Sequence, residues 1–415
     1  MRLNNKLLYP SIIFFLSFSF YFIFAGRFKF VFPTTIYNYF NFLSEAFLHK
    51  SLSFVSRPPY LHDLITFNSR IYVYWGPAPV LVIIPFIIFF GREVSDALYT
   101  SFIASFNPLI LYFLLQQLEK ITLIKTSNFQ KFILCIFFAF GTVHFYLSIF
   151  GTVWFTSQVI SIFYLLLSLL SITRYSDSKN FITLLIATML FGLAVNGRSA
   201  LIFYTPLFLS LLIIPYLINK HFCQLAKHII LVMFIGIIFL TVNAFYNYLR
   251  FGSFFENGYR FHRFAAHLAN DQKRYGFFNL SYVPKNFYYM FTNFPKLVDK
   301  FPFFLFDKEG NSVLFTSPLV LISIFIVKRK HWQNNKLKLI NSSILIGMLL
   351  TIVLLLYFWG TGWVQFGYRY LLDIIPFLII LLAEVISEVP IILTIILLTI
   401  SILINILGTF WFLNL

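Results

Sequence analysis

The sequence predicts an all-α, polytopic transmembrane helical bundle, and three observations lead to that fold class. The first is composition: the 415-residue chain is 60% hydrophobic and 11% charged, with a mean hydropathy of +0.84. A soluble domain of this size could not bury so much apolar surface in one core. Composition therefore excludes a water-soluble enzyme, a disordered chain and a nucleic-acid-binding module, although the net charge is +17.

The second observation is a series of apolar segments, because a bilayer core of about 30 Å needs about 20 helical residues to cross it. The first segment follows the basic N-terminus, near residues 8–25, and we expect it to be retained with its N-terminus inside. Eleven more lie near residues 72–90, 97–117, 131–150, 152–173, 180–195, 200–218, 229–249, 313–327, 339–358, 368–384 and 389–413. Since some are of marginal length, we expect about eleven to thirteen spans in one transmembrane domain, residues 1–415.

The third observation is the placement of Lys and Arg in short connections. Basic residues crowd 174–179, 220–227 and 328–338, which places these segments on the cytoplasmic side and residues 196–199, 250–312 and 360–367 outside. Twelve simple crossings from an internal N-terminus would instead put 250–312 inside. One crossing between residues 72 and 131 must therefore be miscounted, re-entrant or split. We expect a multi-pass protein of the bacterial inner membrane whose functional face is outside.

The long loop 26–71 carries two acidic residues, Glu45 and Asp63. Within residues 37–50, apolar side chains recur at helical spacing, which predicts an amphipathic helix in the membrane interface. A carboxylate near the membrane surface suits a general base that takes a proton from an attacking hydroxyl. The alternatives are a salt bridge of Asp63 with Arg57 or Arg70, or a turn cap, and a place for Glu45 on the wet face of the helix.

Arginines are the second set of candidates, because guanidinium groups bind phosphate oxygens in a bidentate way. Arg250, Arg260 and Arg263 are grouped with aromatic residues in the long loop 250–312, and Arg198 and Arg369 lie at external span ends. Together they could hold a lipid phosphate. The alternatives are contact with lipid headgroups for the loop arginines, and neutralisation of Arg369 by Asp373 at i,i+4.

Several common signals are missing from the sequence. It has no Gly-rich phosphate loop, no HExxH motif, no paired cysteines and no nucleophile elbow. We therefore predict no cofactor and no metal site, and a divalent ion has little support. His144 and Trp154 flank a Gly-Thr-Val-Trp-Phe string near an outer end, where a lone histidine is more often a packing residue.

The order of several short strings resembles the GT-C glycosyltransferases, in particular the dolichyl-phosphate-mannose–protein mannosyltransferases and the lipid A aminoarabinose transferases. The strings lie between residues 37 and 371, and each alone is weakly specific. They are Leu43-Ser-Glu-Ala-Phe-Leu-His, His62-Asp63-Leu, Tyr72-Val-Tyr-Trp-Gly-Pro-Ala-Pro, Gly151-Thr-Val-Trp-Phe, Asn196-Gly-Arg, Tyr246-Asn-Tyr-Leu-Arg-Phe-Gly-Ser and Phe366-Gly-Tyr-Arg-Tyr-Leu-Leu. One departure is that residues 34–38 contain no acid, where such enzymes commonly place one soon after the first helix.

The resemblance implies a sugar transferase that takes its donor from a polyprenyl phosphate and works at the external face on an acceptor that the sequence does not identify. It implies Asp63 or Glu45 as the base, and Arg198, Arg250, Arg260, Arg263 and Arg369 as ligands of the donor phosphate. Substrate-binding candidates near these strings are His62, Arg70, Tyr72, His144, Trp154 and Tyr368. Two other functions stay open: a transporter or flippase of lipid-linked sugars, and a non-catalytic membrane scaffold.

Overall fold

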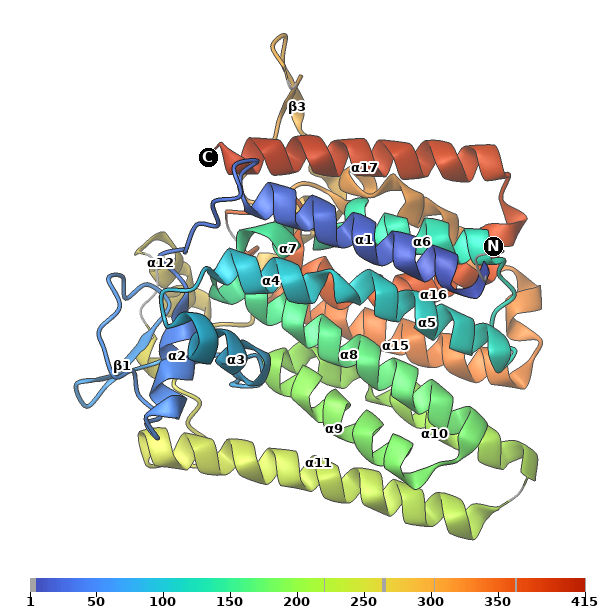
Figure 1. The fold of residues 1–415 in the computed structure, drawn as a ribbon, viewed down its shortest axis with the longest axis horizontal. Coiled ribbons are helices and arrows are strands. Elements are labelled where there is room, and N and C mark those ends of the chain that lie inside the picture. The colour runs from blue at the N-terminus through green and yellow to red at the C-terminus, as the bar shows by residue number, and fades with distance from the viewer. Residues whose placement is uncertain (1–4, 220, 263–265, 302, 363, 415) are drawn as a thin grey trace.

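The computed structural model describes the chain except residues 1–4, 220, 263–265, 302, 363 and 415. It is a bundle of roughly parallel and antiparallel helices with two small hairpins, so the predicted all-α polytopic fold is confirmed (Figure 1). The longer helices are α1 (Asn5–Ala25), α5 (Phe106–Lys120), α6 (Asn128–Phe140), α8 (Thr152–Ser178), α9 (Phe181–Gly197), α10 (Thr205–Asn219), α11 (Phe222–Phe251), α15 (Asn335–Tyr357) and α17 (Ile391–Leu413).

Shorter helices complete the bundle and its connections. They are α2 (Tyr39–Leu48), α3 (Val80–Phe90), α4 (Asp96–Ala104), α7 (His144–Phe150), α12 (Ala266–Tyr275), α13 (Val283–Phe287), α14 (Val313–Thr316) and α16 (Ile375–Val385). The 3-10 helices include η1 (Ser199–Tyr204), η5 (Pro318–Val327) and η7 (Arg369–Asp373). The hairpins pair β1 (Ile65–Phe67) with β2 (Arg70–Tyr72), and β3 (Lys296–Leu297) with β4 (Phe304–Leu305).

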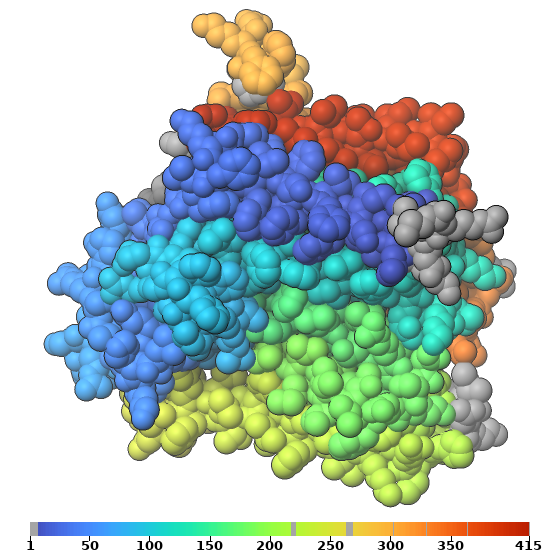
Figure 2. All heavy atoms as spheres, in the orientation of Figure 1, coloured from blue at the N-terminus to red at the C-terminus, as the bar shows by residue number. Residues whose placement is uncertain are grey.

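Helix α8 forms the centre of the bundle and packs against α4, α5, α9 and α10. Of the most apolar 18-residue stretch of α8, 83% is buried inside the protein, whereas the corresponding stretches of α17 and α11 are 22% and 6% buried. A helix that is apolar all round and leaves that surface uncovered by protein is typical of a lipid-facing span. Figure 2 shows α1 and α17 covering one side of the molecule in this way.

By length and apolar character, seven helices among the described residues could cross a membrane, or eight if α6 and α7, bent by 50°, form one broken span. The predicted number, eleven to thirteen, is larger because four of the twelve predicted segments hold shorter apolar helices of 10–17 residues: α3, α9, η5 and α16. With 17 residues, α9 is at the lower limit of a membrane-spanning helix, and the other three are shorter.

Segment 72–90 explains the conflict in the predicted topology. Residues 70–72 belong to strand β2, and α3 has 11 residues, a length of about 16 Å. It lies beside α2 at one end of the bundle and does not run through it (Figure 1). Without this crossing, loops 26–71 and 252–312 lie at one end, which we call the loop end. The basic connections 120–128, 178–181 and 328–334 lie at the opposite, basic end.

Helix α2 matches the amphipathic segment predicted in the first loop, but it does not lie freely in the interface. Seven of its ten residues are buried, and Phe40 and Leu43 are covered because the helix packs against α3 and α8. Leu48 is 44% exposed. Tertiary contacts thus bury most of the surface that the sequence pattern assigned to lipid.

The two long loops meet at the first hairpin. Strand β1 pairs with β2 through a turn at Asn68 and Ser69, whose φ values of +47° and +61° suit a two-residue hairpin turn. Ile65 in β1 also forms a β-bridge with His262, which belongs to the second loop. This bridge brings residues separated by about 200 positions to the same point at the loop end.

Candidate functional site

Asp63 lies in the turn that precedes β1, with a φ of +59° that aspartate tolerates better than most residues. Its side chain is 18% exposed. The indole Nε1 of Trp154, in the first turn of α8, donates a hydrogen bond of 2.9 Å to Oδ2 of Asp63. A bond from a neutral donor fixes the direction of the carboxylate without cancelling its charge.

The start of α8 is held in place by close backbone packing. Gly151 precedes the helix with a φ of +63°, and a Cβ there would lie 2.7 Å from the backbone nitrogen of Ala97. Only glycine combines this conformation with this approach. The close packing of Gly151 against α4 therefore fixes where Trp154 points.

Two histidines flank the other oxygen of Asp63. Oδ1 lies 3.6 Å from Nε2 of His62 and 3.4 Å from Nε2 of His262. The His262 side chain is 2% exposed, and burial lowers its pKa to about 4 despite the nearby charge of Asp63. His262 is therefore neutral at pH 7, so it does not supply a positive charge that would compete for the carboxylate.

The alternative reading of Asp63 as one half of a surface salt bridge finds no support. Within the described part of the chain, neither Arg57 nor Arg70 lies within ion-pairing distance of it. Aromatic rings surround it instead: the ring of Tyr37 is 4.8 Å from that of Trp154, and Tyr74 meets His262 at 4.5 Å, edge to face. Burial, together with the negative charge of Asp63, raises the pKa of Tyr37 above its usual value.

Arg369 lies at the same aromatic cluster. Its guanidinium carbon is 5.9 Å from the ring centre of Trp154, 5.5 Å from Phe155 and 5.1 Å from Tyr370, so three rings surround the charge. Arg369 is 7% exposed, and among the described residues no carboxylate pairs with it and Nε has no hydrogen-bond partner. A buried cation with unused donors is prepared to bind an anion.

The backbone around Arg369 is fastened on both sides. Oε1 of Gln365 accepts a hydrogen bond of 3.0 Å from the Arg369 N–H, and Nε2 of Gln158 donates one of 3.2 Å to the Arg369 carbonyl. Gly362 passes close by, since a Cβ there would lie 2.9 Å from Arg369 Nε. The guanidinium is thus preorganised, which is expected of a binding group.

Arg198 also contacts Tyr370, with its guanidinium carbon 4.8 Å from the ring centre. Its Nε lies 2.7 Å from Oδ2 of the buried Asp373. Asp373 therefore pairs with Arg198, and the considered i,i+4 pairing with Arg369 is not formed. Close packing sets the place of Arg198, because a Cβ on Gly76 would lie 1.7 Å from the carbonyl oxygen of Asn196.

Arg250 and Arg260, in the string 250–263, do not share this arrangement. Arg250 donates to the Val73 carbonyl at 2.8 Å and to Asn247 at 2.8 Å, so its guanidinium fastens α11 to the segment after β2. Its Nε has no hydrogen-bond partner among the described residues. Arg260 has a side chain that is 77% exposed and lies 3.8 Å from Glu256. Arg263 lies outside the described residues.

Four other predicted site residues are used elsewhere. Glu45 accepts a salt bridge from Arg92 at 3.1 Å. His144 is fully buried and bonds to Tyr21, Asn107 and Ser148, as a packing histidine does.

Tyr72 packs against Phe251 with ring centres 5.4 Å apart, and the buried Tyr368 donates to Asn286. Arg70 is exposed in β2. Of the predicted residues, the structure gathers Asp63, His62, Trp154, Arg369 and Arg198 around one cluster of rings.

Sequence reasoning missed His262 and Asp96. His262 stands within the string 250–263, where the arginines are the more conspicuous residues. Asp96 is buried and accepts hydrogen bonds from the backbone N–H groups of Thr35 and Thr152, at 2.9 and 2.8 Å, and from the hydroxyl of Thr35. It joins the first loop to α8, and the Ser95-Asp96 start of α4 was the available signal.

Within the described residues, no group of three or more His, Cys, Asp and Glu side chains is arranged to hold a metal ion.

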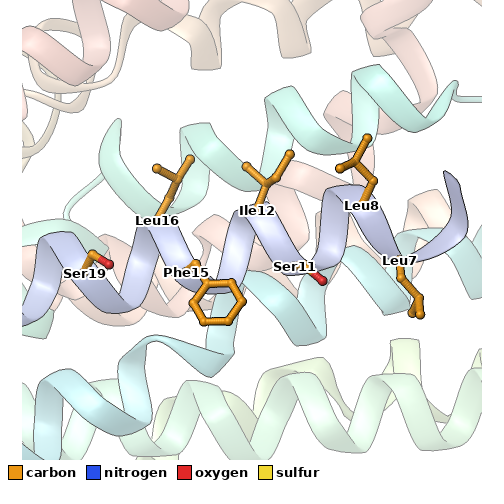
Figure 3. A pocket seen from close by; sticks show the side chains of 7 residues that line it. All are labelled: Leu7, Leu8, Ser11, Ile12, Phe15, Leu16 and Ser19. Carbon is orange, nitrogen blue, oxygen red and sulfur yellow. The ribbon is translucent and has the colours of Figure 1, made fainter. Parts of the chain in front are cut away.

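A hollow of about 390 Å³ lies on the outer side of α1, lined by Leu7, Leu8, Ser11, Ile12, Phe15, Leu16 and Ser19 (Figure 3). It is apolar and far along the bundle from Asp63, so it matches a lipid-facing groove and carries no chemistry.

Comparison with known proteins gave no match to a family model or to a curated protein sequence.

Proposed function

We propose that this protein is an integral-membrane glycosyltransferase of GT-C type that moves a sugar from a polyprenyl phosphate to an acceptor at the loop end of the bundle. The observation that carries the proposal is the position of Trp154. Its N–H group holds the carboxylate of Asp63, and its ring is one wall around the guanidinium of Arg369. A proton acceptor and a cation without a carboxylate partner therefore contact the same aromatic residue, and a displacement at a phosphate-linked carbon uses both kinds of group.

In this reaction the acceptor hydroxyl attacks the anomeric carbon of the sugar, and a new carbon–oxygen bond forms. The bond between that carbon and the phosphate oxygen breaks, and its electron pair stays on the polyprenyl phosphate. Asp63 takes the proton of the hydroxyl, with its orientation set by Trp154 and by the neutral His262. Attack opposite the leaving group inverts the anomeric centre.

Arg369 would bind the leaving phosphate, whose negative charge grows as the bond breaks. Arg198 is half of a neutral pair with Asp373, so its contribution to the phosphate is smaller than that of Arg369. Arg250 instead fastens α11 to the segment after β2, because its two Nη groups donate to the Val73 carbonyl and to Asn247.

The orientation of the molecule supports a reaction on the external side. The connections rich in Lys and Arg gather at the basic end, and such connections remain in the cytoplasm. The loop end with Asp63 would then face outward. We propose the bacterial inner membrane as its location.

The test uses membranes that contain the full-length protein and a radiolabelled polyprenyl-phosphate sugar. Asp63→Asn keeps the size of the side chain and its tolerance of positive φ, so the protein should accumulate normally while transfer is lost. Glu45→Gln serves as the control, because Glu45 pairs with Arg92 away from the cluster, and transfer should persist.

Near-normal transfer by Asp63→Asn would exclude the proposed base. Movement of label across the membrane without covalent transfer would indicate a transporter or flippase. Neither transfer nor movement with the unchanged protein would favour a scaffold.

A further inference from the structure

The second hairpin, residues 296–305, leaves the bundle sideways. It comprises β3, β4 and the described residues between them, 298–301 and 303. Figures 1 and 2 show it projecting beyond α17, across the helix axes and not along them. Its level along the bundle lies between the two ends of α17. Because α17 is a candidate span with most of its apolar stretch uncovered, the hairpin emerges from a lipid-facing side of the molecule.

Large apolar side chains are exposed on this hairpin, beside the exposed charged residues Lys296, Asp299 and Lys300. Leu297 is 79% exposed, Phe301 74%, Phe303 55% and Leu305 52%. Surfaces of this kind mark contact with a membrane or another protein. The first hairpin, in contrast, ends in the polar pair Asn68 and Ser69 and lies at the loop end of the bundle.

The base of the hairpin is anchored in the bundle, so its tip is held out from α17. Phe304 packs against Phe315 with ring centres 5.5 Å apart, and Phe306 packs against Trp411 of α17 at 5.5 Å. Within the hairpin, the N–H of Val298 donates to the carbonyl of Phe303 at 3.0 Å. The projection is therefore a built feature with a rigid root.

Backbone chemistry sets the depth at which the hairpin can lie. Each strand has two residues, so most of its edge N–H and C=O groups are left for solvent, and such groups are too costly in the hydrocarbon core. Lys296 and Lys300 are also exposed, and their long side chains can reach phosphate groups while the neighbouring apolar side chains enter the acyl region. These requirements are met together at the boundary between headgroups and acyl chains.

We infer that the 296–305 hairpin is a lateral lipid anchor that lies in the interface of the leaflet nearest the loop end. Its partner is the phospholipid bilayer itself, with Leu297 and Phe301 on acyl chains and Lys296 and Lys300 on phosphates. This inference does not depend on the proposed sugar transfer. Part of loop 250–312 would then lie parallel to the membrane plane and contact lipid.

The experiment places nitroxide spin labels on single cysteines in protein reconstituted into vesicles of phosphatidylcholine and phosphatidylglycerol. Cys223→Ser provides the background, because Cys223 is exposed whereas Cys135 is buried and out of reach of the label. Leu297→Cys and Phe301→Cys report on the hairpin. Ser69→Cys, at the tip of the first hairpin, is the matched control.

Labels at 297 and 301 should collide with oxygen, which concentrates in lipid, several-fold more than with a water-soluble nickel complex. The label at 69 should show the reverse order, which gives the reference for a site in water. Adding Phe301→Asp should move the label at 297 toward the nickel-accessible range. The inference is overturned if the labels at 297 and 301 match the one at 69, or if both are shielded from both reagents, which would indicate a protein partner or a second copy.

Discussion

Gly362→Ala tests whether the position of the Arg369 guanidinium depends on the space that Gly362 leaves beside it by lacking a Cβ. Gly362 has a φ of +101°, and an added Cβ would lie 2.9 Å from Arg369 Nε and 2.9 Å from Gln365 Oε1. The backbone conformation alone costs an alanine about 1–2 kcal/mol. Because Gln365 also holds the backbone N–H of Arg369, the added methyl group pushes on both the guanidinium and its support.

The expected effect on donor binding follows from the bond that is disturbed. A hydrogen bond to a charged group contributes about 1.5–3 kcal/mol, which corresponds to roughly a tenfold to hundredfold change in affinity. The apparent KM for the polyprenyl-phosphate sugar should rise by that factor, measured as transfer against donor concentration in membranes. Gly360→Ala is the matched control, because it has no positive φ and its nearest contact is Phe358 at 3.7 Å.

Equal donor dependence in Gly360→Ala and Gly362→Ala would refute the reasoning. It would mean that the donor phosphate does not use Arg369, whatever the role of Asp63. A loss of folded protein confined to Gly362→Ala would be visible as a lower midpoint of thermal unfolding in detergent, and the donor dependence is then compared on the folded fraction.

Two further predictions concern buried charge. Arg198→Met should destabilise the protein by about 3–5 kcal/mol, because it leaves the fully buried Asp373 without its partner. Asp373→Asn should cost less, because the Arg198 side chain that loses its partner is 23% exposed. Thermal unfolding of both variants measures the two losses of stability, and equal losses would contradict this asymmetry. Burial lowers the pKa of His262 to about 4 from an ordinary 6.5. Between these pH values the unfolded chain binds a proton at this residue and the folded chain does not. The free energy of unfolding should therefore fall by about 2 kcal/mol as the pH drops from about 7 to 5. His262→Gln should remove that part of the pH dependence, and an unchanged profile would show that His262 is not buried in its neutral form.

The sequence alone determined that the chain is a membrane bundle, since apolar runs of spanning length and basic connections act locally and need no tertiary contact to be recognised. It also singled out Asp63, Trp154 and Arg369, because a charge or an indole at the end of an apolar run is conspicuous. It also indicated that the segment wrongly counted as a simple membrane crossing lies between residues 72 and 131. The remaining choice among several acids and arginines could not be made at that level.

Tertiary structure decided which candidates meet. Asp373 lies four residues from Arg369 but pairs with Arg198, 175 positions away, and His262 reaches Asp63 through a β-bridge between two loops. Glu45 and Arg250 looked equivalent to Asp63 and Arg369. Glu45 pairs with Arg92, and the two Nη groups of Arg250 bond to the Val73 carbonyl and to Asn247. The physical reason is that a polar group buried by packing takes whichever partner the fold brings within about 3 Å, and sequence separation does not enter that choice.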